Sequence, residues 1–312
     1  MGNDPLEHYS QTAAQSSAVV IRNYSTSFGL ACRLLGDEER KDIENIYALV
    51  RIADEVVDGA AAAAGLNPDQ VREQLDALEN ETERALVGGY STNMVVHAFA
   101  LTARRTGIDD TLTRPFFASM RTDVSTADHS QDTLADYIYG SAEVVGLMCL
   151  KVFQAMADAP RTDGEALVQA ARSLGAAFQK VNFLRDLGAD TADLGRHYFP
   201  GVDPAALSEQ HKHELVADIR SDLAVARAGI DSLAPAARRA VLLAHELFLA
   251  LVDRIEDTPA ARLATERVRV PGYQKALIAA KVVGGRFPRT SAGARRSEHR
   301  GTTSETAQEG IS

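Results

Sequence analysis

The sequence has few of the features that mark β-sheets, membrane spans or secreted proteins. Aromatic residues make up 6% of its 312 residues, and no stretch alternates apolar and polar residues in a β-branched setting, so we expect no β-sheet. No run of about 18 apolar residues occurs, which argues against a membrane-spanning helix. Residues 1–11 contain neither a basic segment nor an apolar core. We therefore expect a cytoplasmic protein without a signal peptide.

Cysteine is scarce, and its two occurrences lie far apart. Cys32 occurs in the apolar stretch GLACRLL and Cys149 in GLMCLKVF. This placement predicts buried, reduced thiols rather than a disulfide framework, which fits a cytoplasmic protein.

What the sequence does contain is typical of helices. Its apolar fraction is carried by Ala, Leu and Val, with Glu, Arg, Lys and Gln between them, which gives high helix propensity. Between Gly and Pro breaks, the periodicity predicts helices over residues 11–34, 37–59, 67–87, 91–106, 109–121, 132–157, 163–187, 203–229, 234–256 and 271–283. We expect an all-α fold with one catalytic domain over 11–283, an N-terminal extension over 1–10 and a disordered polar tail over 284–312.

Charge is unevenly distributed along the chain. Ten Lys or Arg residues stand against two Glu between Arg262 and Arg300, a local balance of +8 in a chain of −10, which leaves −18 elsewhere. An acidic body argues against a nucleic-acid partner. The basic C-terminal region is suited to peripheral contact with anionic lipid headgroups on the inner membrane face, and the alternative is a solvated helix and tail. The oligomeric state stays open.

The stretch YALVRIADEVVD carries the first chemically informative pattern. Along a helix, Tyr47, Arg51, Asp54 and Asp58 form one polar stripe between apolar neighbours. Burying two aspartates in this way is costly unless a cation offsets their charge. The pattern indicates a metal site.

A second stripe repeats the pattern on another apolar helix, with Gln179, Asn182, Asp186 and Asp190 in phase. A single Asp-x-x-x-Asp pair is usually a solvated acidic face. Two such pairs on facing helices can hold Mg²⁺, or Mn²⁺ in its place, with coordination positions left for phosphate oxygens. Three neighbouring guanidinium groups suit a diphosphate, namely those of Arg51, Arg185 and Arg196.

Four sequence blocks carry a resemblance to a known family. In chain order they are YSTSF (24–28), RIADEVVD (51–58), YGSAEVVG (139–146) and QKVNFLRDLGADTADLGRHYFP (179–200). On these blocks the chain resembles the squalene and phytoene synthase family, with weaker similarity to about Lys281. The resemblance implies a single-domain, class I isoprenoid synthase-type helical bundle around a central apolar cavity.

The activity implied is the head-to-head condensation of two prenyl diphosphates in carotenoid biosynthesis. Two geranylgeranyl diphosphates would give phytoene through a cyclopropyl (prephytoene) diphosphate, with Mg²⁺ and without NADPH. An alternative is a squalene or dehydrosqualene synthase that uses farnesyl diphosphate, and the squalene outcome would need NADPH. A remoter alternative is a catalytically silent helical interaction protein.

The resemblance also assigns roles to residues. The metal ligands would be Asp54, Asp58, Asp186 and Asp190, which are also catalytic together with Arg51 and Tyr139. Substrate would contact Ser25, Ser27, Phe28, Tyr47, Gln179, Asn182, Arg185, Arg196 and Tyr198. The cavity wall would include Phe28, Tyr47, Tyr139 and Val145, with Tyr139 a candidate to guide proton loss.

Three further residues have no expected role at the site. Glu143 stands where many family members have Gly, and we expect it on the outer side of its helix. His97 and His197 are expected to be ordinary hydrogen-bonding residues, because hard cations prefer oxygen ligands.

Overall fold

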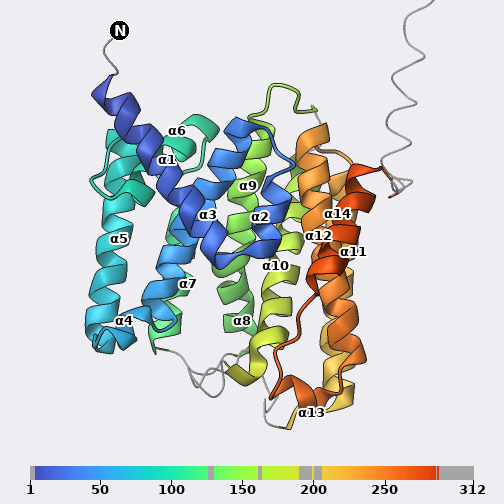
Figure 1. Cartoon of the computed structure of the whole chain (residues 1–312). Coiled ribbons are helices and arrows are strands. Elements are labelled where there is room, and N and C mark those ends of the chain that lie inside the picture. The colour runs from blue at the N-terminus through green and yellow to red at the C-terminus, as the bar shows by residue number, and fades with distance from the viewer. Residues whose placement is uncertain are drawn as a thin grey trace, which may run out of the picture.

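The computed structural model describes residues 4–125, 130–160, 164–189 and 206–285, together with Phe199 and Phe287. Helices are the regular secondary structure of these residues, and no strand occurs among them, as predicted (Figure 1). The helices are α1 (Pro5–Tyr24), α2 (Thr26–Cys32), α3 (Asp37–Val57), α4 (Ala60–Ala63), α5 (Pro68–Gly88), α6 (Met94–Thr106), α7 (Asp110–Ser125), α8 (Gln131–Ile138), the π-helix η1 (Tyr139–Glu143), α9 (Val144–Gln154), α10 (Gly164–Ala189), α11 (Glu209–Ile230), α12 (Pro235–Asp257), α13 (Ala260–Leu263) and α14 (Gly272–Val283). None of the described helices is long and apolar enough to cross a membrane.

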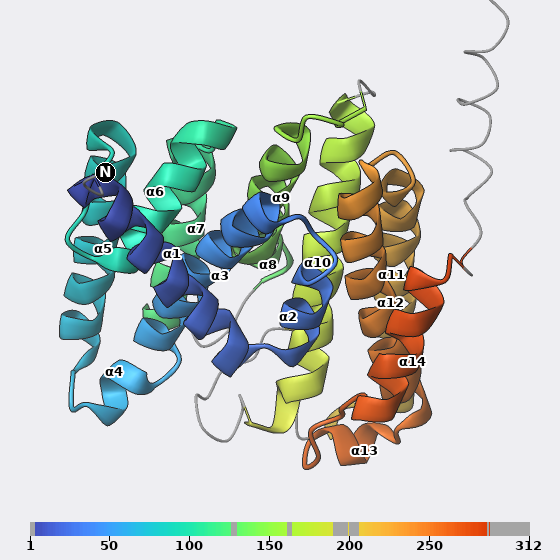
Figure 2. The same cartoon turned by 45° about the horizontal axis from the view of Figure 1, so that its top comes forward.

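The helices form a bundle with α3, α9 and α10 at its centre (Figures 1 and 2). On one side α5, α6 and α7 pack together, and on the other α11, α12 and α14 do so. The apolar core follows this division. One cluster joins α3, α6, α7 and α9 around Phe99, Phe116 and Phe117, and another joins α10, α11 and α12 around Leu184, Ile219 and similar side chains. The two halves thus meet at α3, α9 and α10.

Two predicted helices are interrupted where function-bearing residues lie. The predicted helix 11–34 breaks at Ser25, whose backbone is extended (φ −139°, ψ 112°) and whose Oγ accepts a hydrogen bond from Phe28 N at 3.1 Å. Ser25 is therefore the N-cap of α2. The predicted helix 132–157 contains the π-helical turn η1. This turn rotates the side chains before it about the helix axis, relative to the side chains after it.

The described part of the predicted N-terminal extension 1–10 is helical. Asp4 caps α1, which begins at Pro5, and the Tyr9 hydroxyl donates to the carbonyl oxygens of Ser91 (3.0 Å) and Thr92 (2.9 Å). These residues belong to the helical domain. The predicted tail 284–312 lies almost wholly outside the described residues.

Close backbone packing joins α10 to the segment that contains η1. A Cβ added at Gly175 would lie 2.5 Å from the carbonyl oxygen of Ala142, and one added at Gly146 would lie 2.4 Å from that of Ala171. Both obstacles are backbone atoms, which cannot move aside cheaply. The two glycines let the helices approach at the wall of the cavity described below.

Gly175→Ala is expected to lower the free energy of unfolding by about 1–3 kcal/mol, the usual cost of overpacking. Gly164→Ala is the matched control on the same helix, because nothing lies within 4 Å of its added Cβ. The control should be neutral or slightly stabilising. Urea unfolding followed by circular dichroism measures both, and equal midpoints for the two variants would contradict the packing argument.

Candidate active site

A cavity of about 930 Å³ lies between the two halves of the bundle and is lined by residues of α2, α3, α9, α10, α11 and α12, among others. Its lining follows one stripe of α10 from end to end, through Leu167, Ala171, Leu174, Phe178, Asn182 and Asp186. The stripe is apolar along most of α10 and becomes polar toward its C-terminal end. The C-terminal part of α3 contributes further polar side chains to the cavity. We call this polar end of the cavity the mouth.

The α3 side of the mouth carries the first predicted acidic pair. Asp54 and Asp58 both line the cavity, and Arg51 lies on the same stripe. Arg51 forms an ion pair with Glu55, while its Nη1 lies 4.0 Å from Asp54 Oδ2. The guanidinium also lies over the Tyr24 ring, 4.6 Å from the ring centroid. These partners hold Arg51 at the cavity.

Burial and the negative charge of Asp58 raise the pKa of Asp54 to about 8. In the protein without a bound cation, Asp54 is therefore mostly protonated at neutral pH. A divalent cation at this carboxylate would offset both causes of the raised pKa. A raised pKa of this kind is typical of a carboxylate in a functional site that binds a cation.

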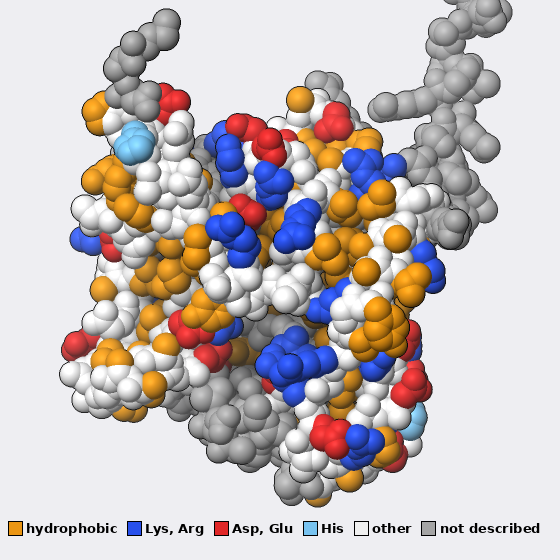
Figure 3. Space-filling view, in the orientation of Figure 1, with side chains coloured by type: hydrophobic (Ala, Val, Ile, Leu, Met, Phe, Trp, Pro, Cys, Tyr) orange, Lys and Arg blue, Asp and Glu red, His pale blue; other side chains and the backbone are white. Residues whose placement is uncertain are grey.

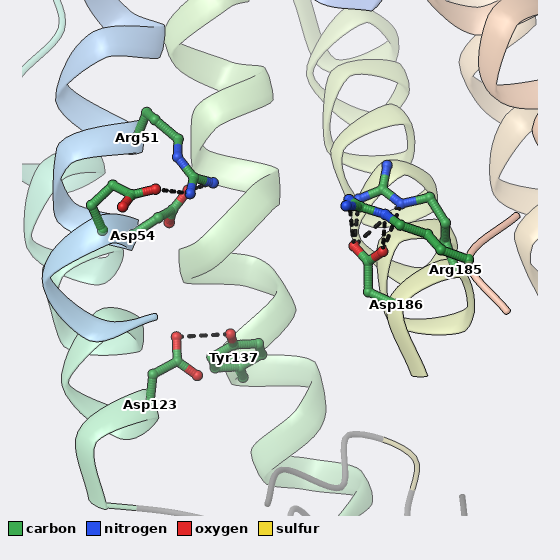
Figure 4. A network of polar contacts seen from close by, with 8 residues as sticks. Arg51, Asp54, Asp123, Tyr137, Arg185 and Asp186 are labelled. Carbon is green, nitrogen blue, oxygen red and sulfur yellow. Dashed lines mark hydrogen bonds and ion pairs between the residues drawn. The ribbon is translucent and has the colours of Figure 1, made fainter. Parts of the chain in front are cut away.

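A third carboxylate and a tyrosine, neither predicted from the sequence, lie beside this pair (Figure 4). Asp123 at the end of α7 lines the cavity and accepts a hydrogen bond from the Tyr137 hydroxyl at 2.9 Å. Its charge also contributes to the raised pKa of Asp54. No Asp stands four positions before or after Asp123 in the sequence, so only the packing of α7 against α3 reveals it.

The α10 side of the mouth carries Asp186, on a different helix from Asp54 (Figure 4). Its carboxylate accepts from Arg185 Nε at 3.0 Å and pairs with Arg267 Nε at 2.7 Å. Arg185 and Arg267 both line the cavity. The predicted partner Asp190 lies outside the described residues, as do Arg196, Tyr198 and His197.

The segment before α14 and the first turn of that helix add positive charge that the sequence analysis assigned to a surface. Arg267, Arg269 and Lys275 line the cavity. Lys275 Nζ donates to Thr26 Oγ1 at 2.7 Å, which ties α14 to α2. Burial, with a smaller contribution from the charge of Arg185, lowers the pKa of Lys275. The local charge excess of the sequence was the available signal, but only the fold shows that these three cations reach the mouth.

The remaining described residues that were predicted to contact substrate or to form the cavity wall line the cavity, with one exception. Lining residues include Ser25, Ser27, Phe28, Tyr47, Gln179, Asn182 and Val145. The Phe28 ring lies 5.5 Å from that of Phe178 and 5.6 Å from that of Phe248, centroid to centroid. Tyr139 is the exception: it is absent from the lining, which instead contains Tyr137.

Tyr139 and Glu143 share one partner outside the cavity. The Arg172 guanidinium lies 5.2 Å from the Tyr139 ring centroid, and its Nε donates to Glu143 Oε2 at 2.6 Å. Glu143 thus faces away from the cavity, as expected, although it is ion-paired rather than fully solvated. His97 is an ordinary buried histidine whose Nε2 lies 3.0 Å from Ser10 Oγ.

Both cysteines are free, as predicted. Cys32 and Cys149 line the cavity, and burial raises the pKa of each thiol to about 12. They are neutral apolar wall residues at physiological pH.

The donor set at the mouth suits a hard divalent cation. Among the described residues, no three His, Cys, Asp or Glu side chains are grouped closely enough to hold an ion by themselves. Mg²⁺ commonly binds one or two protein carboxylates and takes its other ligands from substrate phosphates and water. Asp54, Asp58 and Asp186 offer carboxylates of that kind beside cationic groups that suit the phosphates.

Comparisons with known proteins find phytoene synthases among the relatives of this chain. A chloroplastic phytoene synthase 1 from Zea mays is 31% identical over 283 residues, covering 86% of this chain and 67% of the relative. A 15-cis-phytoene synthase from Paracoccus sp. is 32% identical over 190 residues, covering 60% of this chain and 59% of the relative. The chain thus matches less than two thirds of the length of the Paracoccus protein.

Solved structures share the fold at lower identity. A dehydrosqualene synthase in complex with ligand superimposes with a TM-score of 0.72 at 21% identity, covering 90% of this chain and 99% of that one. The squalene synthase HpnC from Alicyclobacillus acidocaldarius gives a TM-score of 0.67 at 19% identity, covering 82% and 98%. The sequence profile of the squalene/phytoene synthase family matches residues 21–274. The chain therefore belongs to the squalene/phytoene synthase family.

Proposed function

We propose that this chain condenses two molecules of geranylgeranyl diphosphate head to head to phytoene. One observation carries the proposal: a long apolar cavity opens at a mouth where aspartates of α3 and α10 stand among Arg51, Arg185, Arg267 and Lys275. Such a mouth suits a diphosphate with its cations, and such a cavity suits a long hydrocarbon chain. The names of the relatives support the same activity.

The depth of the cavity favours a C20 chain over a C15 chain. Its lining on α10 runs from Leu167 to Asp186, which at 1.5 Å per residue spans about 28 Å. An extended carbon chain advances about 1.2 Å per bond, so geranylgeranyl measures about 19 Å and farnesyl about 14 Å. With the diphosphate at the mouth, the C20 chain reaches along about two thirds of this lining and the C15 chain along about half, so the C20 chain buries more of its apolar surface.

The overall chemistry needs no redox cofactor. Joining two C20 diphosphates to a cyclopropyl diphosphate releases one pyrophosphate and one proton. Rearrangement of that intermediate to phytoene releases the second pyrophosphate and a second proton. A squalene outcome would instead take a hydride from NADPH.

Each part of the site has a role in this scheme. Arg51, Arg185, Arg267 and Lys275 bind and orient the diphosphate oxygens. Asp54, Asp58 and Asp186 would hold Mg²⁺, with Asp190 as a further ligand proposed from the sequence, and the bound metal would stabilise the charge of the departing pyrophosphate. Arg196 and Tyr198 are proposed to assist from the adjoining segment.

The apolar wall protects reactive intermediates. Carbocations must be kept from water, and the apolar lining of α9, α10 and α12 excludes it. The rings of Phe178 and Phe248 are stacked with centroids 3.8 Å apart beside Phe28, and their faces can stabilise a cation. Among the tyrosines we assign Tyr137, whose hydroxyl is held by Asp123, to the reacting end of the cavity.

Product analysis tests the proposal. The protein incubated with geranylgeranyl diphosphate and Mg²⁺ should release two pyrophosphates per hydrocarbon formed, and the hydrocarbon should have the mass of phytoene with or without NADPH. Removal of divalent cations with EDTA should stop release. A C30 hydrocarbon formed in preference from farnesyl diphosphate would support the squalene or dehydrosqualene alternative. Absence of release with either substrate would favour a silent interaction protein.

A further inference from the structure

The cavity continues beyond the part that a C20 chain covers. Its lining along α10 spans about 28 Å from Asp186 to Leu167, and a geranylgeranyl chain of about 19 Å leaves about 9 Å of that span uncovered. The uncovered part is lined by Leu150 of α9, Leu167 of α10, Ile230 at the end of α11 and Leu233 just after it. We call these four residues the far end. The proposed substrate leaves the far end unfilled.

Helix pairing places the side chains of the far end at one level. The close contacts that α10 makes with η1 and α9 run antiparallel, so Leu150 comes level with Leu167. A Cβ added at Gly229 of α11 would lie 2.3 Å from Ala170 Cβ, and Leu233 follows Gly229 by one turn. The far end therefore lies toward the connection between α9 and α10, at the top of Figure 1, whereas the mouth lies at the other end of α10.

The far end is apolar, and the charges of the lining are gathered at the mouth. Among the described residues, every Asp, Lys and Arg of the lining belongs to the mouth. Figure 3 shows Lys and Arg side chains between the two halves of the bundle, below the position of α2. An apolar space stays dry and favours hydrocarbon, and a chain that reaches it gains in buried apolar surface. The far end is thus suited to a longer prenyl chain.

We propose that the far end accepts one further isoprene unit, so that the protein condenses a C25 prenyl diphosphate with geranylgeranyl diphosphate to a C45 hydrocarbon. This inference rests on the proposed function. A C25 chain measures about 24 Å and ends within the span of about 28 Å, whereas a C30 chain of about 29 Å overruns it. Because α10 offers one such path, the partner chain keeps the C20 length.

The reaction balances as it does for phytoene. One pyrophosphate and one proton leave as the cyclopropyl diphosphate forms. A second pyrophosphate and a second proton leave as that intermediate rearranges to the hydrocarbon. No oxidant or reductant is consumed.

Competition between prenyl diphosphates of different length tests the inference. Wild-type protein with Mg²⁺ and equal amounts of geranylgeranyl diphosphate and its C25 homologue should form the C45 hydrocarbon beside phytoene, and mass separates the two products. A cavity that ended at the C20 length would reject the five extra carbons by more than about 100-fold. We expect kcat/KM for the C25 substrate within about tenfold of that for the C20 substrate, and rejection of the C30 homologue by about 100-fold or more.

Leu167→Trp tests where the extra unit lies. The larger side chain fills space at the far end, so the ratio of C45 to C40 product should fall at least about tenfold, while phytoene formation falls much less. Leu150→Phe narrows the same level from α9 and should act in the same direction. Val168→Trp is the matched control and should leave the ratio unchanged, because Val168 is 39% exposed and is absent from the lining.

Binding of unreactive thio-analogues separates this inference from the proposed function, because it needs no turnover. In calorimetry with Mg²⁺, the C25 analogue should bind wild type at least about tenfold more tightly than the C20 analogue, since its extra carbons are buried among apolar side chains. Leu167→Trp should abolish that difference.

The possible failures can be told apart. Phytoene formation without C45 product, or a C25 analogue that binds more weakly than the C20 analogue, would overturn the inference and leave the proposed function intact. C45 product whose share neither Leu167→Trp nor Leu150→Phe lowers would remove the far end from the path of the chain. Absence of any hydrocarbon from any of these substrates would overturn the proposed function, and the condensation proposed here with it.

Discussion

Asp54→Asn is expected to reduce pyrophosphate release by at least about 10²–10³-fold, the usual cost of losing one group that stabilises charge in the transition state. Asn keeps the shape of the side chain but supplies a neutral oxygen where the site needs an anionic ligand. The steady-state rate at saturating Mg²⁺ measures the loss. Asp257→Asn, which alters an exposed aspartate at the end of α12, is the control and should act like wild type.

The same variant should have the opposite effect on stability. Because the pKa of Asp54 is raised to about 8, the folded protein holds a proton that the unfolded chain releases above about pH 4. Wild-type stability without metal therefore falls as pH rises from about 4 to about 8, and is level above that range. Asn carries no such penalty. At pH 8 and without metal, Asp54→Asn should be more stable than wild type by about 1–3 kcal/mol, and near pH 4 the gain should vanish.

Urea unfolding at the two pH values, with EDTA present, measures this difference. Millimolar Mg²⁺ with pyrophosphate should then raise the unfolding midpoint of wild type but not of Asp54→Asn, because ligands that bind only the folded state stabilise it. An Asp54→Asn protein that is active, or that is less stable than wild type at pH 8, would remove Asp54 from the cation site.

Ala171→Phe is expected to change the length of chain that the cavity accepts. Ala171 lines the cavity fifteen positions before Asp186 on α10, about 22 Å from the mouth. A phenyl ring there would meet the last isoprene unit of a C20 chain but not the end of a C15 chain. We expect kcat/KM for geranylgeranyl diphosphate to fall about 100-fold, since each excluded methylene group costs about 1 kcal/mol or more. The value for farnesyl diphosphate should stay within a few-fold of wild type.

Ala217→Phe on the exposed side of α11 provides the control for an added ring. Competition between the two substrates, with C30 and C40 hydrocarbons separated by mass, gives the ratio directly. An equal loss for both substrates would mean that Ala171 lies on the path of every chain, and no loss for either would mean that the chain does not run along α10.

The sequence allowed the elements of this fold to be predicted well because their signals are local. The Gly and Pro breaks place α3, α5, α6 and α12 within a few residues of their observed bounds. Asp54 and Asp186 each lie within one regular α-helix and, together with Asp58 at the C-cap of α3, line the cavity. An amphipathic stripe is a property of a single helix and needs no knowledge of its neighbours.

The parts that the sequence did not reveal depend on irregular backbone or on distant contacts. The π-helical turn η1 changes the helical phase, so the positions of Tyr137 and Tyr139 cannot be read from an α-helical projection. Ser25 breaks a helix that periodicity alone would continue. Arg267 reaches Asp186 across 81 positions of sequence, and no local pattern encodes such a contact.

The central claim is that carboxylates of α3 and α10 hold cations that in turn hold a diphosphate at the mouth of the cavity. Crystals grown with Mn²⁺ and an unreactive thio-analogue of geranylgeranyl diphosphate test it through the anomalous signal of manganese. We expect Mn²⁺ peaks bonded to Asp54 and to Asp186, bridged by diphosphate oxygens, with the hydrocarbon chain running toward Ala171. Manganese bound elsewhere, or a diphosphate held without any metal contact to these two aspartates, would contradict the account.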